Sequence, residues 1–377
     1  METFDVAVIG AGIAGASVAS ELSASHRVAL LEREDQPGYH TTGRSAALFS
    51  ETYGPPVIRA LSRASSGFYG APPPGFGDAP LLTPRGVLLI AREDQLAHAD
   101  EMMAEVAAGS PVSRLDAART LAMMPLLRAG YVAGAVFEPG ARDIDVHALH
   151  QGGYLRQFRA RGGVLRTRCE LLALERSGAG WALRTSGGTI RAEVVVDAAG
   201  AWADEVAAMA GVPRIGLVPK RRTALVVSAP GGAVPHGWPM VVDIDEQFYL
   251  KPDAGRLLIS PADETPSPPC DAQPEEIDVA ICIDRIERAF DITVGRIENK
   301  WAGLRSFVAD KTPVAGFDPG APGFFWLAGQ GGYGIQTAPA LARTAAAMIR
   351  GEPIPPDVAD QGVSAAALSP QRLGRAA

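Results

Sequence analysis

Residues 4–15 read FDVAVIGAGIAG. Phe4–Ile9 is a short apolar run, which predicts a buried parallel strand. It continues directly into Gly10–Gly15, which has the pattern G-x-G-x-x-G. A helix-forming stretch follows over 16–25, and a second apolar strand over 27–31 ends at Glu32, 20 residues after the second glycine. This order of strand, turn, helix, strand and acid predicts a dinucleotide-binding βαβ unit.

Each residue type in this unit has a physical role. Gly10 permits a tight turn, Gly12 lets the backbone approach a pyrophosphate, and Gly15 lets helix and strand pack closely. The free N–H groups at the helix start offer partial positive charge to phosphates. Glu32 can accept hydrogen bonds from ribose hydroxyls. A lone motif is equally typical of a glycine turn in an ordinary α/β unit, but the complete context favours dinucleotide binding.

Composition excludes several classes of protein. The 377 residues are 47% hydrophobic and 20% charged, which excludes a disordered chain or a coiled coil. The net charge of −7 argues against nucleic acid as a partner. No apolar stretch is long enough for a transmembrane segment. Cys169, Cys270 and Cys282 have no metal-ligand spacing, so we expect no metal site. With no secretory signal at Met1, we expect a cytoplasmic protein, with peripheral contact at the inner membrane face left open.

Two more glycine turns follow apolar strands. Glu193–Asp197 leads into Ala198-Ala199-Gly200, and Phe324–Leu327 leads into the glycine cluster 329–334, which opens an alanine-rich helix over 338–349. Thr41-Thr42-Gly43-Arg44-Ser45 is a further helix start made of small and hydroxyl residues. Turns of this kind present backbone amides at helix starts. Together they predict one extended cofactor that spans the domain.

Four stretches carry a family resemblance. They are His40–Ala47, Val196–Trp202, Ala302–Phe307 with Asp310–Pro313, and Gly329–Gln336. In this order and spacing they resemble the FAD-dependent D-amino-acid oxidase superfamily, and within it the bacterial D-arginine and D-amino-acid dehydrogenases. The resemblance implies non-covalently bound FAD. It also implies an α/β (α+β) fold in which a Rossmann-type FAD-binding domain is interleaved with a mixed-sheet substrate domain.

The resemblance also implies a division of the chain and a set of cofactor residues. We expect the FAD-binding domain over 1–85, 140–215 and 300–360, the substrate-binding domain over 86–139 and 216–299, and a weakly structured tail over 361–377. The expected cofactor-binding residues are Gly10, Gly12, Ile13, Ala14, Gly15, Glu32, Arg33, Thr42, Gly43, Arg44, Ser45, Ala46, Leu171, Ala199, Gly200, Trp202, Gly303, Gly331, Gly332, Tyr333, Gly334, Ile335 and Gln336.

The substrate domain has its own predicted elements. We expect strands over Gly86–Ala91, Thr223–Ser228, Gln247–Lys251 and Arg256–Ser260, and helices over Asp94–Ala108 and Glu275–Phe290.

A bidentate guanidinium is a strong anchor for a carboxylate. Arg221 and Arg222 point to opposite faces of a strand, so one of them can face inward. By resemblance, Arg222 and Arg305 anchor the substrate carboxylate, Tyr249 donates a hydroxyl to it, and Tyr53 covers the substrate from a loop. The alternatives are a solvated basic edge for Arg222, a surface arginine for Arg305, core packing for Tyr249 and an exposed loop aromatic for Tyr53.

Further pocket residues follow from the same resemblance. Gln336 and Gly332 would contact the substrate amine and the flavin, and Tyr333 is an additional candidate. Leu48 and Val87 depart from the arginine dehydrogenases, which carry a histidine and a glutamate at these positions. Loss of the acid removes the partner of a cationic side chain and makes the pocket apolar. We therefore expect a neutral, hydrophobic substrate side chain.

The histidines form no catalytic constellation. His26, His98, His147, His150 and His236 fall on predicted helix surfaces or loops, and His40 adjoins the flavin motif. A site without a catalytic histidine agrees with hydride transfer, in which the flavin does the chemistry and the protein orients the substrate.

We therefore expect an FAD-dependent D-amino-acid dehydrogenase or oxidase. Hydride transfer from the α-carbon to flavin N5 would give an imino acid that hydrolyses to a 2-oxo acid and ammonia. The electron acceptor, oxygen or a quinone, stays open. Alternatives are an amine or cyclic-imino-acid oxidase, a quinone-linked 2-hydroxyacid dehydrogenase, and a non-catalytic flavoprotein subunit.

Overall fold

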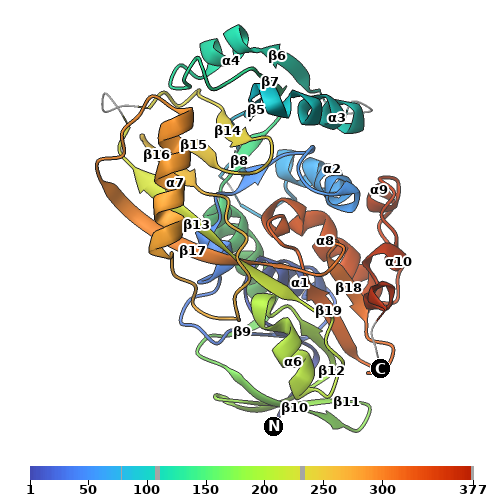
Figure 1. Cartoon of the computed structure of the whole chain (residues 1–377). Coiled ribbons are helices and arrows are strands. Elements are labelled where there is room, and N and C mark those ends of the chain that lie inside the picture. Colours follow the sequence, from blue (N-terminus) through green and yellow to red (C-terminus); the bar gives the residue numbers. More distant parts are fainter. Residues whose placement is uncertain (78, 107–110, 230–233, 375–377) are drawn as a thin grey trace.

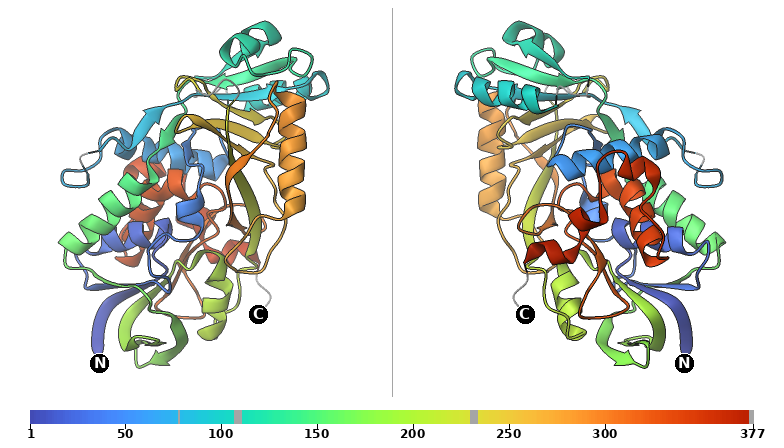
Figure 2. Two further views of the ribbon diagram at one scale, coloured as in Figure 1. Left: turned by 90° about the vertical axis from the view of Figure 1, so that its left-hand side faces the viewer. Right: turned by 90° about the vertical axis from the view of Figure 1, so that its right-hand side faces the viewer.

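The computed structural model describes residues 1–77, 79–106, 111–229 and 234–374. Its strands form two large sheets and one small sheet. The first large sheet lies near the N-terminus in the lower part of Figure 1, and the second extends into the upper part. The side views show the same two halves, with helices from the first half packed beneath the second (Figure 2).

The first sheet is built around parallel strands. Its order is β10-β11-β12-β1-β2-β9, and β19 joins it by pairing with β12 and β18. The central strand β1 is parallel to both β12 and β2. Strands β2 and β19 are buried throughout, as expected for a sheet covered on both faces. The strands are β1 (Glu2–Ile9), β2 (Val28–Leu31), β9 (Val164–Arg166), β10 (Leu171–Ser177), β11 (Gly180–Thr185), β12 (Gly188–Asp197), β18 (Val314–Phe317) and β19 (Phe324–Ala328).

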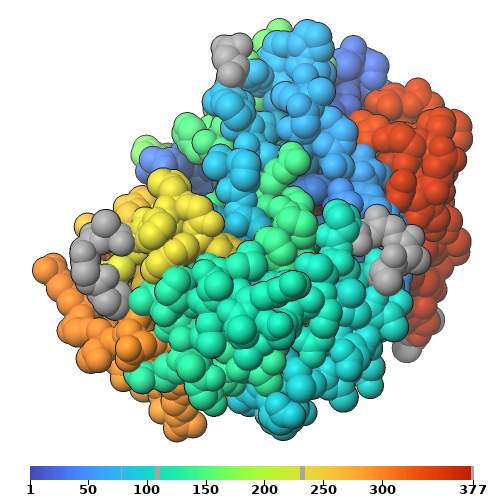
Figure 3. Space-filling view, turned by 90° about the horizontal axis from the view of Figure 1, so that it is seen from above, coloured from blue at the N-terminus to red at the C-terminus, as the bar shows by residue number. Residues whose placement is uncertain are grey.

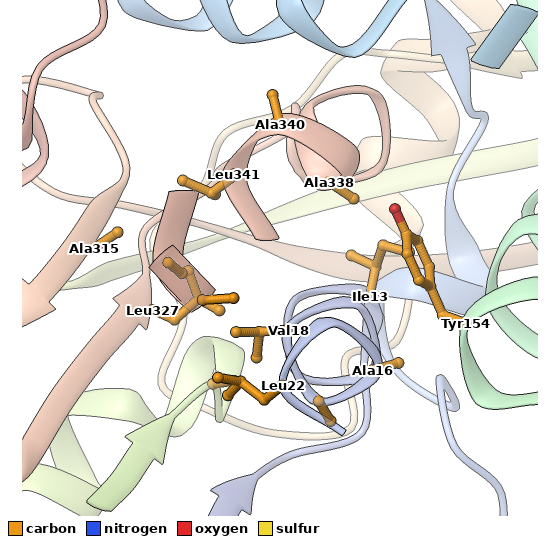
Figure 4. Packing of buried hydrophobic residues seen from close by; sticks show 14 of the residues in the cluster. Ile13, Ala16, Val18, Leu22, Tyr154, Ala315, Leu327, Ala338, Ala340 and Leu341 are labelled. Atoms are coloured by element: carbon orange, nitrogen blue, oxygen red, sulfur yellow. The ribbon is translucent and has the colours of Figure 1, made fainter. Parts of the chain in front are cut away.

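Two helices begin at the glycine turns and pack against this sheet. They are α1 (Ile13–Leu22) and α8 (Gly334–Ile349), which contact each other. Small buried residues such as Ala16 and Ala338 allow this close packing. Figure 4 shows Val18 and Leu22 of α1 gathered beside Leu327 of β19. The sheet core therefore fixes the direction in which both helix starts point.

The second sheet is mostly antiparallel. Its order is β17-β13-β16-β15-β14-β5-β7-β6, and helix α7 (Glu276–Ala289) contacts β13 and β16. Strand β17, which the expected domain division splits at residue 300, lies wholly in this sheet. The strands are β5 (Val87–Ala91), β6 (Ser113–Asp116), β7 (Gly134–Glu138), β13 (Val218–Val227), β14 (Met240–Asp243), β15 (Tyr249–Asp253), β16 (Arg256–Ser260) and β17 (Ile297–Phe307).

Short elements connect the two halves. A three-stranded sheet contains β3 (Leu48–Phe49), β8 (Arg142–Ile144) and β4 (Leu82–Pro84). The other helical segments are η1 (Thr41–Arg44), α2 (Pro56–Gly70), η2 (Glu93–Gln95), α3 (Leu96–Val106), α4 (Ala117–Met123), the π-helix η3 (Ala148–Leu155), α5 (Arg156–Ala160), η4 (Gly200–Trp202), α6 (Ala203–Met209), α9 (Pro356–Ala359), α10 (Ala365–Leu368) and η5 (Pro370–Leu373). Among the residues described, none of the helices has the length and apolar character needed to cross a bilayer.

The Rossmann-like sheet and the second sheet confirm the predicted fold class. The predicted helix Asp94–Ala108 begins as η2 and continues as α3 to Val106, while residues 107 and 108 lie outside the described part. The expectation of a weakly structured tail is wrong over 361–374. Leu368 and Pro370 are buried there because α10 and η5 pack against β18. Figure 3 shows the red C-terminal part of the chain beside the blue N-terminal part, in agreement with the contact between α9 and α2.

One buried histidine supports the first glycine turn. His150 is 2% exposed, and its Nε2 lies 2.9 Å from the carbonyl oxygen of Ala11, so this nitrogen carries a proton. Burial lowers the pKa of His150 to about 4 from its ordinary 6.5, although the carbonyls of Ala11 and Gly12 oppose that shift. The sequence placed this residue on a surface or loop, and that prediction is wrong.

We predict that His150 makes the protein acid-labile. The unfolded chain binds the proton near pH 6.5 and the folded chain only near pH 4, so stability present above pH 6.5 is lost as the pH falls toward 4. The loss reaches up to about 3 kcal/mol. The free energy of unfolding of His150→Gln should fall less steeply between these pH values. His26→Gln, at a half-buried position where the ring contacts the hydroxyl of Ser25, is the control. Equal slopes in His150→Gln and the parent protein would contradict this account.

Candidate active site

A cavity of about 290 Å³ lies between the two sheets. Its first wall comes from the glycine turns at Gly10, Gly200 and Gly331 and from η1. The opposite wall comes from β13, β15 and β17, which contribute Arg222, Tyr249 and Arg305. Residues far apart in the chain therefore meet at the ends of the first sheet's parallel strands, where ligands bind in such folds.

The first glycine turn is too tight for other residues. Gly10 has φ +93°, and a Cβ added to it would lie 2.6 Å from the oxygen of Ala198. A Cβ on Gly15 would lie 1.8 Å from the oxygen of Gly10. These contacts give Gly10 and Gly15 the roles that the sequence predicted for them. They bring the start of α1 to the edge of the cavity.

Glu32 is fixed at the end of β2. It is 8% exposed, and its carboxylate accepts hydrogen bonds from the backbone N–H groups of Ala11 and Glu34, each at 3.0 Å. Thr42 ties η1 to the same turn because its hydroxyl accepts a hydrogen bond from the N–H of Ile13 at 2.9 Å. The acid and η1 are thus locked around one helix start.

Most of the predicted cofactor residues line this cavity. They are Gly10, Gly12, Ile13, Ala14, Glu32, Arg33, Thr42, Arg44, Ser45, Ala46, Leu171, Ala199, Gly200, Trp202, Gly303, Gly331, Gly332, Gly334 and Ile335. Gly15, Gly43, Tyr333 and Gln336 are not part of its lining. Gly43 instead donates its N–H to the oxygen of Gly38 in the turn before η1.

Arg33, His40 and Trp202 form a cluster in the cavity lining, and we call the end of the cavity where they lie its outer end. The Arg33 guanidinium lies 4.1 Å from the centre of the Trp202 ring, and the His40 and Trp202 rings are 4.8 Å apart. Arg33 and His40 both contact Glu34 at 2.9 Å. Burial alone would raise the pKa of Glu34, but these two partners outweigh it and lower the pKa.

Arg44 joins the two halves of the molecule. Its Nη1 donates to the oxygens of Ala272 and Ala302, each at 2.9 Å, and its Nη2 contacts Asp271. The guanidinium is therefore engaged by the protein itself. Its contribution to the cavity is structural, because it holds η1 against β17.

Two guanidinium groups lie on one face of the second sheet. Lys220 and Arg222 are alternate residues of β13, so their side chains lie on the same face of the sheet. Lys220 pairs with Arg305 of β17, which places Arg305 on that face as well. Arg221 points to the other face and bonds Asp278 of α7. Arg222 is therefore the member of the pair whose side chain lines the cavity. Burial, with the nearby charge of Arg305, lowers the pKa of Arg222.

The two arginines differ in their partners. Arg222 donates from Nε to the backbone carbonyl oxygen of Asp263, and its Nη2 contacts the carboxylate of Glu264 at 3.2 Å. Arg305 donates to the hydroxyl of Tyr53 at 3.3 Å. Within the described residues, Arg305 forms no ion pair with a carboxylate. Arg305 is half-buried, and a cation in such a position without a carboxylate partner favours an anionic ligand.

Tyr53 reaches Arg305 from the loop between β3 and α2. Its ring lies 4.9 Å from the ring of Tyr333, edge to face, and the next residue, Gly54, has φ +94°. Gln336 is buried and accepts a hydrogen bond from the N–H of Ser50 at 3.2 Å. Its carboxamide oxygen is therefore directed at this loop, whereas the resemblance assigned Gln336 to the substrate amine.

Leu48, Val87 and Tyr249 belong to one apolar cluster with Met240 and Leu258. Tyr249 is only 5% exposed and also lines the cavity. The cluster therefore packs behind Tyr249, and we call it the apolar wall. Leu48 and Val87, which the sequence predicted as pocket residues, are not themselves part of the cavity lining.

Sequence reasoning missed Glu138. This acid ends the apolar strand β7 and is 3% exposed. Burial raises its pKa, while hydrogen bonds from Thr52 and Ser50 oppose the shift. A single glutamate after an apolar strand was the only signal in the sequence.

Comparison with known proteins gives consistent results. A family model described as FAD dependent oxidoreductase (DAO) matches residues 5–348. The chain is 27% identical to glycine oxidase of Geobacillus kaustophilus over 359 residues, which cover 89% of this chain and 90% of that protein.

Solved structures share the fold. The crystal structure of glycine oxidase from Geobacillus kaustophilus superposes with a TM-score of 0.80 at 26% identity, covering 93% of this chain and 96% of that one. The structure of L-α-glycerophosphate oxidase from Mycoplasma pneumoniae with FAD bound gives a TM-score of 0.83 at 18% identity, covering 93% and 95%. The chain thus belongs to the DAO family of FAD-dependent oxidoreductases.

Proposed function

We propose that this enzyme oxidises an amino acid with a neutral, hydrophobic side chain, and that it acts on the D-enantiomer. The substrate loses a hydride from its α-carbon and becomes an imino acid, which water hydrolyses to a 2-oxo acid and ammonia. FAD, when bound, accepts the hydride. The D-stereochemistry rests on the resemblance to D-amino-acid dehydrogenases alone.

The residues around the glycine turns fit FAD. The contacts at Gly10 and Gly15, which a residue with a Cβ could not make, bring the start of α1 to the cavity, and Gly10 and Gly12 line it. Glu32, Arg33 and Trp202 surround the outer end of the cavity. We assign the nucleotide to this end and the flavin to the end lined by Ser45, Gly303 and Gly332.

The observation that carries the proposal is the half-buried guanidinium of Arg305, which lines the cavity beside Arg222 and has no carboxylate partner among the described residues. A substrate carboxylate would neutralise this pair and accept hydrogen bonds from it. Tyr53 and Tyr249 flank the same position and would fix its orientation. Anchoring of the carboxylate determines which face of the α-carbon the flavin meets.

The apolar cluster supports the choice of side chain. Leu48, Val87 and Met240 provide no charge for a cationic substrate side chain. Burying a guanidinium or ammonium there would cost free energy, whereas an aliphatic side chain would gain it. Similarity to glycine oxidase supports a substrate that carries an amine next to a carboxylate.

The experiment that tests this proposal is anaerobic mixing of the FAD-loaded enzyme with D- and L-amino acids, followed by flavin absorbance. We predict that D-leucine, D-methionine and D-phenylalanine bleach the flavin faster than D-arginine. Faster reduction by D-arginine would contradict the assignment of the apolar wall. A flavin that stays oxidised with every amino acid would overturn the proposed function and favour amines, 2-hydroxyacids or a non-catalytic subunit.

A second prediction concerns Val87→Glu. This change places a carboxylate in the apolar wall, so kcat/KM for D-arginine should rise relative to D-leucine by about tenfold or more. The uncharged variant Val87→Gln is the matched control for side-chain size. A shift of equal size in both variants would show that polarity or shape, and not charge, decides the preference.

A further inference from the structure

Three hydrogen-bond donors converge on the buried carboxylate of Glu138. The hydroxyls of Ser50 and Thr52 donate to its Oε2 at 2.7 and 2.6 Å, and the backbone N–H of Glu51 donates to Oε1 at 2.9 Å. The donors come from three consecutive residues of one loop. The acceptor comes from a strand of the second sheet.

No basic side chain shares this carboxylate among the residues that the structure describes, so the loop alone satisfies it. A buried acid keeps its partners because losing one leaves an acceptor without compensation. The three contacts therefore act as a clamp on Ser50–Thr52. We call this set of contacts the loop anchor.

The loop anchor ends where the predicted substrate contact begins. Tyr53 follows Thr52 directly, and its hydroxyl accepts from Arg305 at 3.3 Å. Gln336 of α8 holds the N–H of Ser50 from the other side. The segment is thus fixed by the second sheet and by the helix that starts at the cavity.

We infer that Glu138 is a positioning residue: through Ser50, Glu51 and Thr52 it holds the loop in the conformation that places Tyr53 against Arg305. Only the predicted effect on substrate binding rests on the proposed function, because the hydrogen bonds of the loop anchor are present whichever substrate the enzyme oxidises. Glu138 touches no reacting atom. It acts through Tyr53, which would share the substrate carboxylate with the two arginines.

A competing role for Glu138 follows from the register. Val87 and Glu138 are opposite each other in adjacent strands and share a face of the sheet. Glu138 could in principle receive a cationic substrate side chain. The three donors already occupy its oxygens, which favours the anchor.

The test compares the FAD-loaded parent enzyme with Glu138→Gln and Thr52→Val. Amide hydrogen exchange should accelerate by about tenfold to a hundredfold over residues 50–54 in Glu138→Gln, because hydrogen bonds to a charged acceptor are lost. Thr52→Val removes one donor and should give a smaller increase. Exchange in β1 should stay unchanged. Glu51→Gln is the matched control, since Glu51 contributes its backbone N–H to the anchor and keeps it.

A kinetic measurement separates positioning from general destabilisation. In anaerobic flavin reduction by D-leucine, the apparent Kd should rise roughly tenfold in Glu138→Gln while the limiting rate constant changes by less than about threefold. The double variant with Thr52→Val should be less than additive.

Two results would overturn the inference. One is unchanged exchange over residues 50–54 in Glu138→Gln. The other is a loss of D-arginine oxidation in Glu138→Gln with D-leucine unaffected, which would assign Glu138 to a substrate cation. If no amino acid reduces the parent enzyme, the proposed function fails, and the exchange experiment still decides whether the anchor exists.

Discussion

The close contact between Gly15 and the oxygen of Gly10 is the constraint on which the rest of the site depends. It lets α1 start directly at the end of β1, so the first free N–H groups of the helix face the cavity. Glu32 and Thr42 bind the same turn through Ala11 and Ile13. His150 donates a hydrogen bond from Nε2 to the carbonyl oxygen of Ala11 in the same turn. The cofactor end of the cavity is therefore rigid before any ligand arrives.

The substrate end follows a different principle, which is electrostatic. Arg222 and Arg305 come from neighbouring strands of the second sheet and lie on one face, where Arg222 is buried and Arg305 is half-buried. Arg44 ties η1 to β17, so the wall that carries the arginines is hydrogen-bonded directly to the wall that carries the glycine turns. A cationic site beside an apolar cluster supports our proposal of a substrate in which an anion is attached to an apolar group. An amino acid with an aliphatic or aromatic side chain has this composition.

Local sequence patterns predicted a large part of this arrangement. The contact between Gly15 and Gly10 arises within six residues of the G-x-G-x-x-G turn, and strand alternation separates Arg221 from Arg222. The roles of His150, Glu138 and Arg44 could not be predicted in this way. Each depends on a partner more than 80 residues distant in the chain, and nothing in the sequence near His150 or Glu138 indicates that contact. The packing of 361–374 was missed for the same reason, because β18 lies far away in sequence.

The central claim is that the guanidinium groups of Arg222 and Arg305 hold the carboxylate of an amino acid beside the flavin. The most direct measurement is the rate of anaerobic flavin reduction by D-leucine compared with D-leucinol, which keeps the amine and side chain but lacks the carboxylate. The account predicts that the second-order rate constant falls at least about a hundredfold for D-leucinol, as expected when charge-assisted hydrogen bonds are lost. It also predicts that Arg305→Met largely removes the difference. Equal rates for the two compounds in the parent enzyme would contradict the claim.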